Sequence, residues 1–164
     1  MELDMIVSFL SLLAAVLLVA VDQLIKWWAT EVLQPMGAMT LLPGVVELHY
    51  YLNDGMAFSM LSGRQGLLIA VTSIVLIGVL FMLVRRKMHP MERVAWTLIL
   101  GGGVGNLIDR VLNGVVVDYV NVLFVDFAVF NFADMCITGG VILLMAWVLR
   151  DSFKKEAKEE KPTG

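Results

Sequence analysis

The chain has 164 residues, of which 59% are hydrophobic and 16% are charged, and its formal net charge at pH 7 is −3. A typical soluble protein has about 25% charged residues, so this chain has too few polar side chains to cover its apolar ones in water. The composition therefore predicts a single-domain integral membrane protein, and it argues against a soluble fold and against a basic surface for nucleic acid.

The first hydrophobic segment, residues 5–21, carries no charge and lies between Asp4 and Asp22. As a helix it would extend about 25 Å, close to the ~30 Å of hydrocarbon in a bilayer. A cleaved signal peptide is the alternative, but the basic start and small-residue cleavage site of such peptides are missing. We therefore expect an uncleaved first span. Asp22 and Lys26 lie one helical turn apart at its far end, which favours a structural ion pair over direct substrate contact.

Residues 31–64 are expected to form an insertion rich in β structure rather than a span, because glycine and proline interrupt them. Within the insertion, residues 45–52 read VVELHYYL, a composition typical of a strand. The sequence Asn53-Asp54-Gly55 then predicts a turn, because these residue types tolerate turn conformations. Asn53 can be either a turn residue or part of a site.

Three later segments are long, apolar and uncharged, and they predict three further spans: residues 65–84, 94–108 (in a helix that begins near Met91) and 135–149. The middle segment contains the sequence GGGVGN, in which Gly101 and Gly105 form a GxxxG pair. Such a pair lets two helices approach closely. Packing within the protein is favoured over a groove for a helical substrate.

The predicted fold is therefore an α-helical membrane protein with four transmembrane helices and a small β-strand subdomain. Residues 1–150 form one membrane domain, in which 31–64 and 109–134 are the long connections. Residues 151–164 form a charged tail that is expected to be solvated and partly disordered.

The distribution of basic residues predicts the orientation of these spans. The connection 85–93 has four lysines and arginines and the segment from Arg150 has five, while the long connections hold the other three, namely Lys26, Arg64 and Arg110. Because basic residues mark the cytoplasmic side, both termini are expected in the cytoplasm and both long connections outside.

In this orientation, polar residues from four separate parts of the chain come together at the outer ends of the spans. They are Asp22, Lys26, Asn53, Asn106, Asp109, Arg110, Asp118, Asn131 and Asp134. Ionisable residues at membrane depth are costly and mark functional sites. The sequence therefore predicts one site at the outer face.

The residues available there limit the chemistry. His89 lies at the opposite end, so no serine or cysteine has a plausible histidine partner for a nucleophilic triad. The glycine-rich segment lacks the Lys-Ser/Thr of a nucleotide loop. A single cysteine, Cys136, excludes a cysteine-based zinc cluster. Carboxylates, amides and one arginine remain, and neither a metal nor a cofactor is expected.

Asp118 and Asp134 are the candidate catalytic pair. Two carboxyl groups that share a site cannot both ionise readily, so one keeps a proton and polarises a carbonyl while the other activates water. Asp126 lies mid-stretch and is the less favoured partner. Metal binding by oxygen ligands and an ion-translocation relay are alternatives. A relay is disfavoured because the inner halves of the spans are expected to lack carboxylates.

Five motifs, in order along nearly the whole chain, resemble those of the lipoprotein signal peptidases (signal peptidase II). They are Asp22-Gln23-x-x-Lys26, Asn53-x-Gly55-x-Ala57-Phe58, Gly101-Gly102-x-x-Gly105-Asn106-x-x-Asp109-Arg110, Val116-Val117-Asp118-Tyr119 and Phe130-Asn131-x-Ala133-Asp134. Tyr119, where the family often has phenylalanine, and Met56 are departures that leave the acids unchanged.

The resemblance implies an aspartic endopeptidase of the bacterial cytoplasmic (inner) membrane. Such an enzyme removes the signal peptide from diacylglyceryl-modified prolipoproteins by cleaving before the lipidated cysteine. The insertion would correspond to the family's extracytoplasmic β-cradle. Partners would be the prolipoprotein, membrane lipid and inhibitory globomycin-type cyclic peptides, and a monomer is expected. The alternative is a non-enzymatic membrane binding or transport protein with an outward-facing acidic site.

By the same resemblance Asp118 and Asp134 would be catalytic. Residues that would bind substrate or support the site are Asn53, Gly55, Asn106, Asp109, Arg110, Asn131, Ala133, Asp22 and Lys26.

Overall fold

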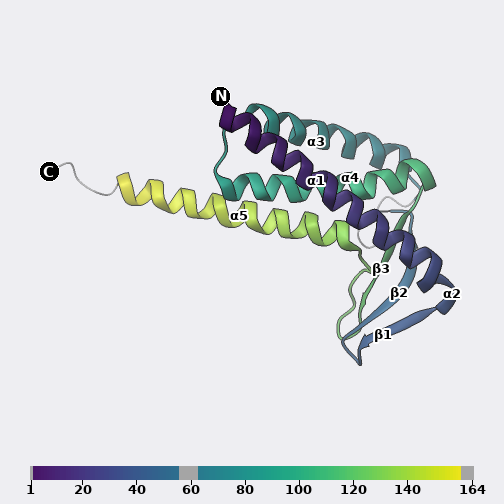
Figure 1. The fold of residues 1–164 in the computed structure, drawn as a ribbon. Coiled ribbons are helices and arrows are strands. Elements are labelled where there is room, and N and C mark those ends of the chain that lie inside the picture. Colours follow the sequence, from purple (N-terminus) through teal and green to yellow (C-terminus); the bar gives the residue numbers. More distant parts are fainter. Residues whose placement is uncertain (1, 56–62, 160–164) are drawn as a thin grey trace.

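The computed structural model describes residues 2–55 and 63–159. Four long helices lie side by side, and a small antiparallel sheet extends from one end of them (Figure 1). The helices are α1 (Glu2–Trp28), α3 (Gln65–Arg85), α4 (Pro90–Asn113) and α5 (Phe132–Glu159). The predicted return of the chain after Gly55, with Ala57 and Phe58, lies outside the described residues.

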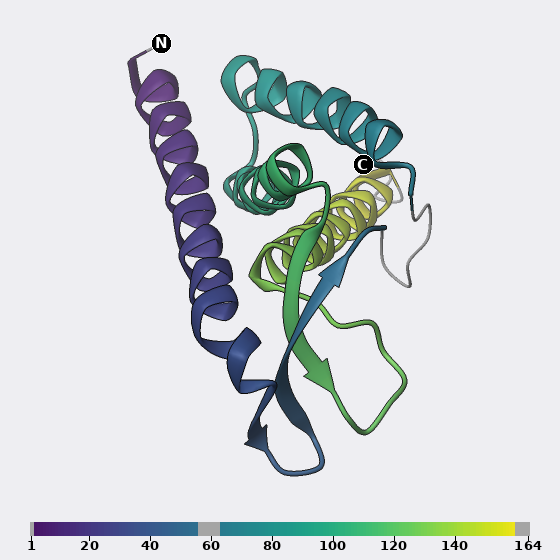
Figure 2. The same cartoon turned by 90° about the vertical axis from the view of Figure 1, so that its right-hand side faces the viewer.

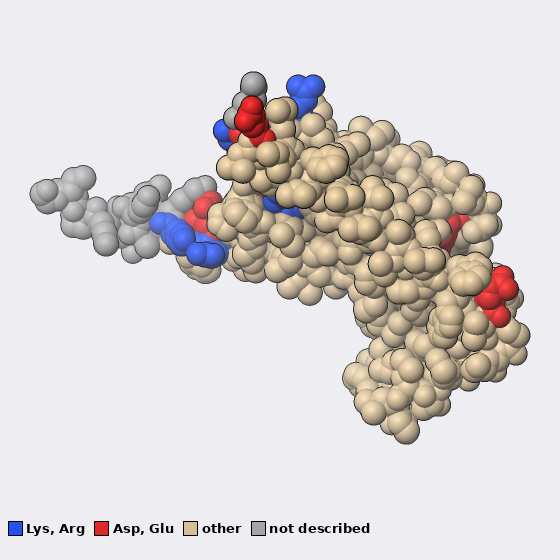
Figure 3. Space-filling model, in the orientation of Figure 1, with Lys and Arg blue, Asp and Glu red and all other residues tan. Residues whose placement is uncertain are grey.

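Three of the helical segments are long and apolar enough to cross a membrane: 2–36, 65–85 and 132–154. This confirms the mostly helical membrane architecture predicted from composition. Figure 3 shows the same property from outside, because uncharged side chains cover most of the visible face of the bundle and charged ones lie toward its ends. The remaining long helix, α4, carries charged residues near both of its ends.

Helix α4 has a distinct signal at each end. The His89 side chain accepts a hydrogen bond from the backbone N–H of Met91, and Pro90 stands in the first turn, where proline costs no hydrogen bond. Gly114 ends the helix in the left-handed region, at φ 72°. Because α4 begins at Pro90, Glu92 lies inside the helix and is buried. The expectation that the inner halves of the spans lack carboxylates was therefore wrong.

Helix α4 contacts all three other long helices, and its glycines make this possible (Figure 2). Gly101 faces α1, Gly102 faces α5 and Gly103 faces α3, and a side chain at any of them would collide with the neighbouring helix. Gly105 faces Asp22 of α1 in the same way. The Gly101–Gly105 pair therefore serves packing within the protein, as predicted.

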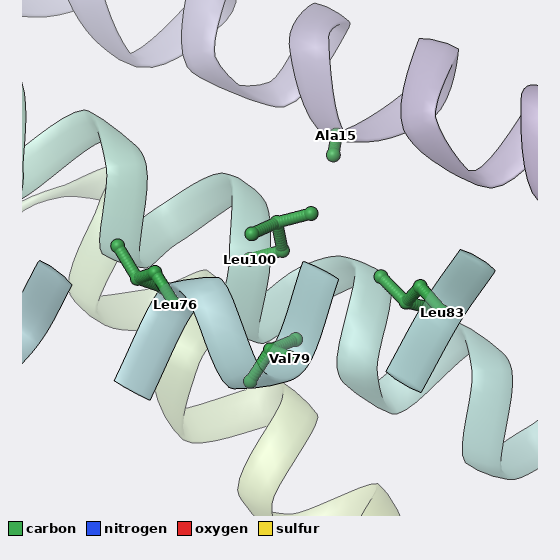
Figure 4. Packing of buried hydrophobic residues seen from close by; sticks show 5 residues of the cluster. All are labelled: Ala15, Leu76, Val79, Leu83 and Leu100. Carbon is green, nitrogen blue, oxygen red and sulfur yellow. The ribbon is translucent and has the colours of Figure 1, made fainter. Parts of the chain in front are cut away.

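The core of the bundle lies where α1, α3 and α4 meet. Figure 4 shows its buried side chains, which are Ala15, Leu76, Val79, Leu83 and Leu100. A second buried cluster joins the end of the first helical segment to the sheet, and it comprises Ala29, Leu33, Leu48, Val117 and Tyr119. The sheet is thereby fixed to the bundle by apolar contacts.

The sheet has the strand order β1 (Ala38–Leu42), β2 (Val46–Asn53) and β3 (Val116–Val122), with antiparallel pairing throughout. Strand β2 confirms the strand predicted at 45–52. In the register of β2 with β3, Tyr51 lies opposite Asp118 and Asn53 lies opposite Val116. Since alternate residues share a face, Asn53 is a diagonal neighbour of Asp118 on the same side of the sheet.

Two boundaries differ from the expectations. The first helical segment continues past Trp28 through a π-helical turn (Ala29–Leu33) and α2 (Gln34–Met36), so 31–36 are helical rather than part of a β-rich insertion. Helix α5 continues to Glu159 where a partly disordered tail was expected. Lysine, glutamate and alanine dominate that end and have high helix propensity, which outweighs the charge density.

Candidate active site

Asp118 is fixed by two amide side chains. It lies on β3 and is 1% exposed. Asn53 Nδ2 donates to Asp118 Oδ2 at 2.9 Å, and Asn131 Nδ2 donates to Asp118 Oδ1 at 2.6 Å. Because each carboxyl oxygen has its own donor, the plane of the group is fixed.

The electrostatic surroundings of Asp118 favour its protonated form. Burial raises the pKa of Asp118 from 3.8 to about 7, because the charged form loses its hydration. The hydrogen bond from Asn53 lowers this pKa, the negative charge of Asp134 raises it, and Asn131 and Lys26 lower it. Burial outweighs the opposing contributions, so near neutral pH this carboxyl can hold or release a proton.

Asp134 lies in the first turn of α5, where it forms a capping box with Asn131. Asn131 Oδ1 accepts from the backbone N–H of Asp134 at 2.9 Å, and Asp134 Oδ2 accepts from the backbone N–H of Asn131 at 3.2 Å. The other oxygen, Oδ1, accepts from Asn106 Nδ2 at 2.7 Å. Asp134 is therefore held by the helix terminus and by α4 together.

The other free N–H groups at the start of α5 are bound by residues from two other elements. Tyr119 of β3 accepts from the backbone N–H of Phe132 at 3.0 Å through its hydroxyl. Asp22 of α1 accepts from the backbone N–H of Ala133 at 3.0 Å. An α-helix leaves its first four N–H groups without partners inside the helix. Here those groups anchor α5 to the sheet and to α1, which fixes where Asp134 lies.

A buried lysine connects this support to the site. Lys26 Nζ lies 2.9 Å from both Asp22 Oδ2 and Asp109 Oδ2, and it donates to Asn106 Oδ1 at 2.8 Å. The expected Asp22–Lys26 pair is thus present and is extended by a second carboxylate. Asn106 Oδ1 also accepts from Asn131 Nδ2 at 3.1 Å. Asn106 therefore joins the buried ion pairs to the residues that hold both acids.

Asp118 and Asp134 line one cavity of about 590 Å³. Asn53, Asn106 and Arg110 also line it, as do residues 127–130 and the α5 face from Met135 to Ile142. Eight residues of helix span about 12 Å, so the cavity extends from the acids along α5. An arrangement with two carboxyl groups at one end and an apolar wall beyond suits acid–base chemistry on an amphipathic substrate.

Arg110 lines the cavity and is bound to the chain just after β2 through Gly55. The Arg110 guanidinium donates to the Gly55 carbonyl at 2.9 Å and to the Asn106 carbonyl at 3.4 Å. Its buried Nε has no partner among the residues that the structure describes. The Gly55 N–H donates to Asn53 Oδ1 at 2.9 Å. Asn53 is thus both the predicted turn residue and a partner of Asp118.

The remaining candidates lie behind the cavity or away from it. Asp109 binds Lys26 and accepts from the Val117 backbone N–H at 3.3 Å, so it supports β3 rather than lining the cavity. Ala133 is fully buried against Gly102. Asp126 lies in the exposed turn after β3.

Two residues with clear roles were missed by sequence reasoning as site residues. Gln23 Nε2 donates to Asp109 Oδ1 at 3.0 Å, to the Gly105 carbonyl at 3.2 Å and to Asp22 Oδ2 at 3.3 Å. Tyr119 caps α5. Gln23 could have been identified as a polar residue next to Asp22 in an otherwise apolar helix. Nothing in the sequence indicated that the Tyr119 hydroxyl would bind the start of α5.

Residues 14–150 match the family described as Signal peptidase (SPase) II. A lipoprotein signal peptidase of Streptococcus pyogenes serotype M6 is 39% identical over 137 residues, which cover 83% of this chain and 90% of the relative. Its counterpart from serotype M1 is 38% identical over the same share of each chain.

Two solved structures, both described as bacterial membrane enzymes, have the same fold. One has a TM-score of 0.82 and 32% identity and covers 94% of each chain. The other has a TM-score of 0.77 and 33% identity, and covers 86% of this chain and 93% of the other. On the family match and the identity to these relatives, the chain belongs to the signal peptidase II family.

Proposed function

We propose that this protein is a lipoprotein signal peptidase, a membrane aspartic endopeptidase that removes the signal peptide from diacylglyceryl-modified prolipoproteins by cleaving before the lipidated cysteine. Asp118 and Asp134 are its catalytic pair. The observation that carries the assignment is that both carboxyl groups line one cavity and share Asn131 as a hydrogen-bond partner.

The two acids take different roles in the proposed reaction. Asp118, whose pKa burial raises to about 7, holds the proton and donates a hydrogen bond to the scissile carbonyl. Asp134 lies at the N-terminus of α5, where the helix dipole stabilises negative charge, and it takes a proton from the attacking water. Transfer of that proton to the leaving amine breaks the C–N bond. No metal or cofactor takes part.

The remaining polar residues of the cavity position the substrate and the acids. Asn53 and Asn131 orient Asp118, and Asn106 orients Asp134. Arg110 lies at the cavity wall, where its guanidinium is placed to bind a carbonyl of the substrate. The apolar α5 face beyond Asp134 would accommodate apolar parts of the prolipoprotein.

The membrane setting explains where the site lies. We infer that α4 is the fourth span, because its residues 94–108 are uncharged and its charged residues lie toward its ends. Both termini would then be cytoplasmic and the sheet would lie at the outer face of the bacterial inner membrane. A substrate held by acyl chains moves in the membrane plane. Withdrawing those chains would cost about 0.8 kcal/mol per CH₂, so the acids must lie near the interface.

We further propose that the protein acts as a monomer surrounded by lipid and that globomycin-type cyclic peptides inhibit it by occupying the cavity. A monomer is consistent with the site, because both acids and the amides that hold them belong to one chain.

The direct test is to incubate detergent-purified protein with a diacylglyceryl-modified prolipoprotein and look for the shortened product. We expect product from the wild type, none from Asp118→Asn or Asp134→Asn, and wild-type activity from Asp126→Asn, a control acid in the same stretch. A non-enzymatic binding protein would retain the substrate without shortening it. Normal cleavage by Asp118→Asn would exclude the assignment of the pair.

A further inference from the structure

A second groove lies at the end of the bundle away from the sheet, between α1 and the beginning of α4. Its volume is about 780 Å³. The α1 wall extends from Leu3 to Val21, and the α4 wall extends from Pro90 to Leu98. At 1.5 Å per residue these walls are about 27 Å and about 12 Å long. The part bounded by both helices is thus close to half of the ~30 Å hydrocarbon thickness, which is the depth of one leaflet.

The groove changes in polarity along its length. Apolar side chains such as Leu10, Leu17 and Leu98 line its deeper part, whereas the charged residues Asp4, Lys87 and Arg93 line the end near the helix starts, with a net positive charge. Figure 3 shows basic side chains at this end of the bundle, one of them recessed among uncharged ones. An apolar trough with cations at one end matches the polarity of a phospholipid with an anionic head group.

Arg93 supplies a positive charge whose hydrogen-bond acceptors, among the residues that the structure describes, carry no charge. It is 9% exposed, and it donates to Ser8 Oγ at 3.3 Å, to the Leu83 carbonyl at 3.1 Å and to the Arg86 carbonyl at 3.3 Å. All three acceptors are uncharged. A cation at the wall of an apolar groove attracts an anion more strongly than one in water, because the local dielectric constant is low.

Lys87 adds a second, exposed cation to the lining of the groove. Its side chain is 84% exposed and lies 2.9 Å from Asp4. An exposed ion pair contributes little to stability, so Lys87 can exchange this partner for a phosphate at small cost. Basic pockets between transmembrane helices bind anionic lipid head groups in this way.

We propose that this groove binds one acyl chain of an anionic membrane phospholipid, with its phosphate beside Lys87 and Arg93. The shape favours a chain over a second helix. A spanning helix needs a wall of about 30 Å, whereas both helices bound this groove over only about 12 Å. The proposal depends on the groove and on the membrane setting, and it does not depend on peptidase activity.

The test measures lipid retention by native mass spectrometry of the detergent-purified full chain. The probes are dioleoylphosphatidylglycerol, which is anionic, and dioleoylphosphatidylcholine, which has the same chains without net charge. We expect each protein to retain one phosphatidylglycerol molecule and to prefer it over phosphatidylcholine about fivefold or more. A preference of this size corresponds to the attraction between one basic residue and an anionic head group. Equal retention of the two lipids would overturn the proposal.

Two substitutions on α1, one inside the groove and one outside it, test where the lipid binds. Ala14 lines the groove, whereas Ala20 is exposed on the same helix and does not line it. We expect Ala14→Trp to lower retention about tenfold or more by displacing several methylenes, and Ala20→Trp to retain lipid like the wild type. Unchanged retention by Ala14→Trp would place the lipid elsewhere and overturn the proposal.

A second pair tests the charge without altering packing. Lys87 lines the groove and Arg86 does not, although both are exposed in the same connection. Lys87→Gln should lower phosphatidylglycerol retention about fivefold, and Arg86→Gln should not. A wild-type dimer that Ala14→Trp dissociates would show a second copy in the groove and would contradict the proposal. Cleavage of prolipoprotein, measured in parallel, reports separately on the proposed function.

Discussion

Asn131 Nδ2 donates to Asp118 Oδ1 across 2.6 Å, while the Oδ1 atom of the same amide accepts from the backbone N–H of Asp134 at 2.9 Å. One buried side chain therefore sets the positions of both acids. Asn131 is fully buried, so its amide has no alternative partners in bulk water. The separation of the two carboxyl groups thus depends on a residue that carries no charge and takes no proton.

We expect Asn131→Ala to lower the cleavage rate about 10- to 100-fold, because it removes the side-chain hydrogen bonds that hold Asp118 and the start of α5, each of which contributes about 0.5–1.5 kcal/mol. The measurement is the rate of prolipoprotein shortening. Asn121→Ala is the matched control, since Asn121 donates to Glu47 on the sheet at 2.9 Å, away from the cavity. Equal rates for the two variants would show that Asn131 does not orient the pair.

The pKa of Asp118, which burial raises to about 7, predicts how stability depends on pH. Because the folded-state pKa lies above the unfolded value of 3.8, the folded chain binds the extra proton between these values. The stabilising contribution is full below the unfolded pKa and is lost as pH rises through about 7. Unfolding in detergent at several pH values should therefore show the wild type losing stability relative to Asp118→Asn between about pH 4 and pH 7.

The same titration governs activity if Asp118 is the acid, so the cleavage rate should fall as pH rises above the pKa of about 7. A rate that keeps rising well beyond this pH would contradict that role. The Asp126→Asn variant keeps Asp118 and should therefore show the same fall in cleavage rate over this pH range.

Lys26 is predicted to be needed for folding more than for chemistry. Lys26→Met would leave the carboxylates of Asp22 and Asp109 buried without their cation. Removing one partner from buried ion pairs costs about 3–5 kcal/mol. Lys87→Met, which breaks an exposed pair with Asp4, should leave stability nearly unchanged. Comparing unfolding midpoints of the two variants tests this, and equal midpoints would contradict it.

Gly102→Ala should destabilise the protein by about 1–3 kcal/mol, the usual cost of overpacking. The added methyl group would collide with the Ala133 carbonyl at the start of α5, and the displaced helix carries Asp134, so activity should fall as well. Gly78→Ala is the control, because it lies on a helix with open space around it and alanine favours helix. Unfolding and cleavage assays compare the two variants. Equal stability and equal cleavage rates would contradict the prediction.

Cleavage should proceed at the wild-type rate in EDTA, because in the proposed reaction the two carboxyl groups activate water themselves. The assay compares untreated enzyme, chelated enzyme and chelated enzyme with divalent cation restored. Loss of activity in EDTA with recovery on adding a metal ion would favour a metal-dependent reaction.

Much of this arrangement could be predicted from the sequence, because apolar length and the positions of charges follow simple physical rules. The apolar segments located the long helices, and the residues 45–52 located β2. The convergence of polar residues at one end pointed to Asp118 and Asp134, and the structure places both at one cavity.

The rest depended on contacts between residues far apart in the chain. The bond between Asp22 and the Ala133 backbone joins residues 111 positions apart, and no local pattern indicates it. The groove beside Arg93 results from how α1 and α4 pack, which the composition of neither helix determines. The start of α4 near Met91 was predicted to within one residue of Pro90, but the burial of Glu92 inside this helix was not expected.

The capping of α5 makes the first turn of that helix depend on α1. Asp22 of α1 accepts from the backbone N–H of Ala133, the residue next to Asp134. Asp22 is itself paired with Lys26, which also pairs with Asp109 of α4. Among the described residues that line the cavity of the two acids, none belongs to α1. A substitution that shifts α1 should therefore displace Asp134 and alter the proposed catalytic pair without touching the substrate.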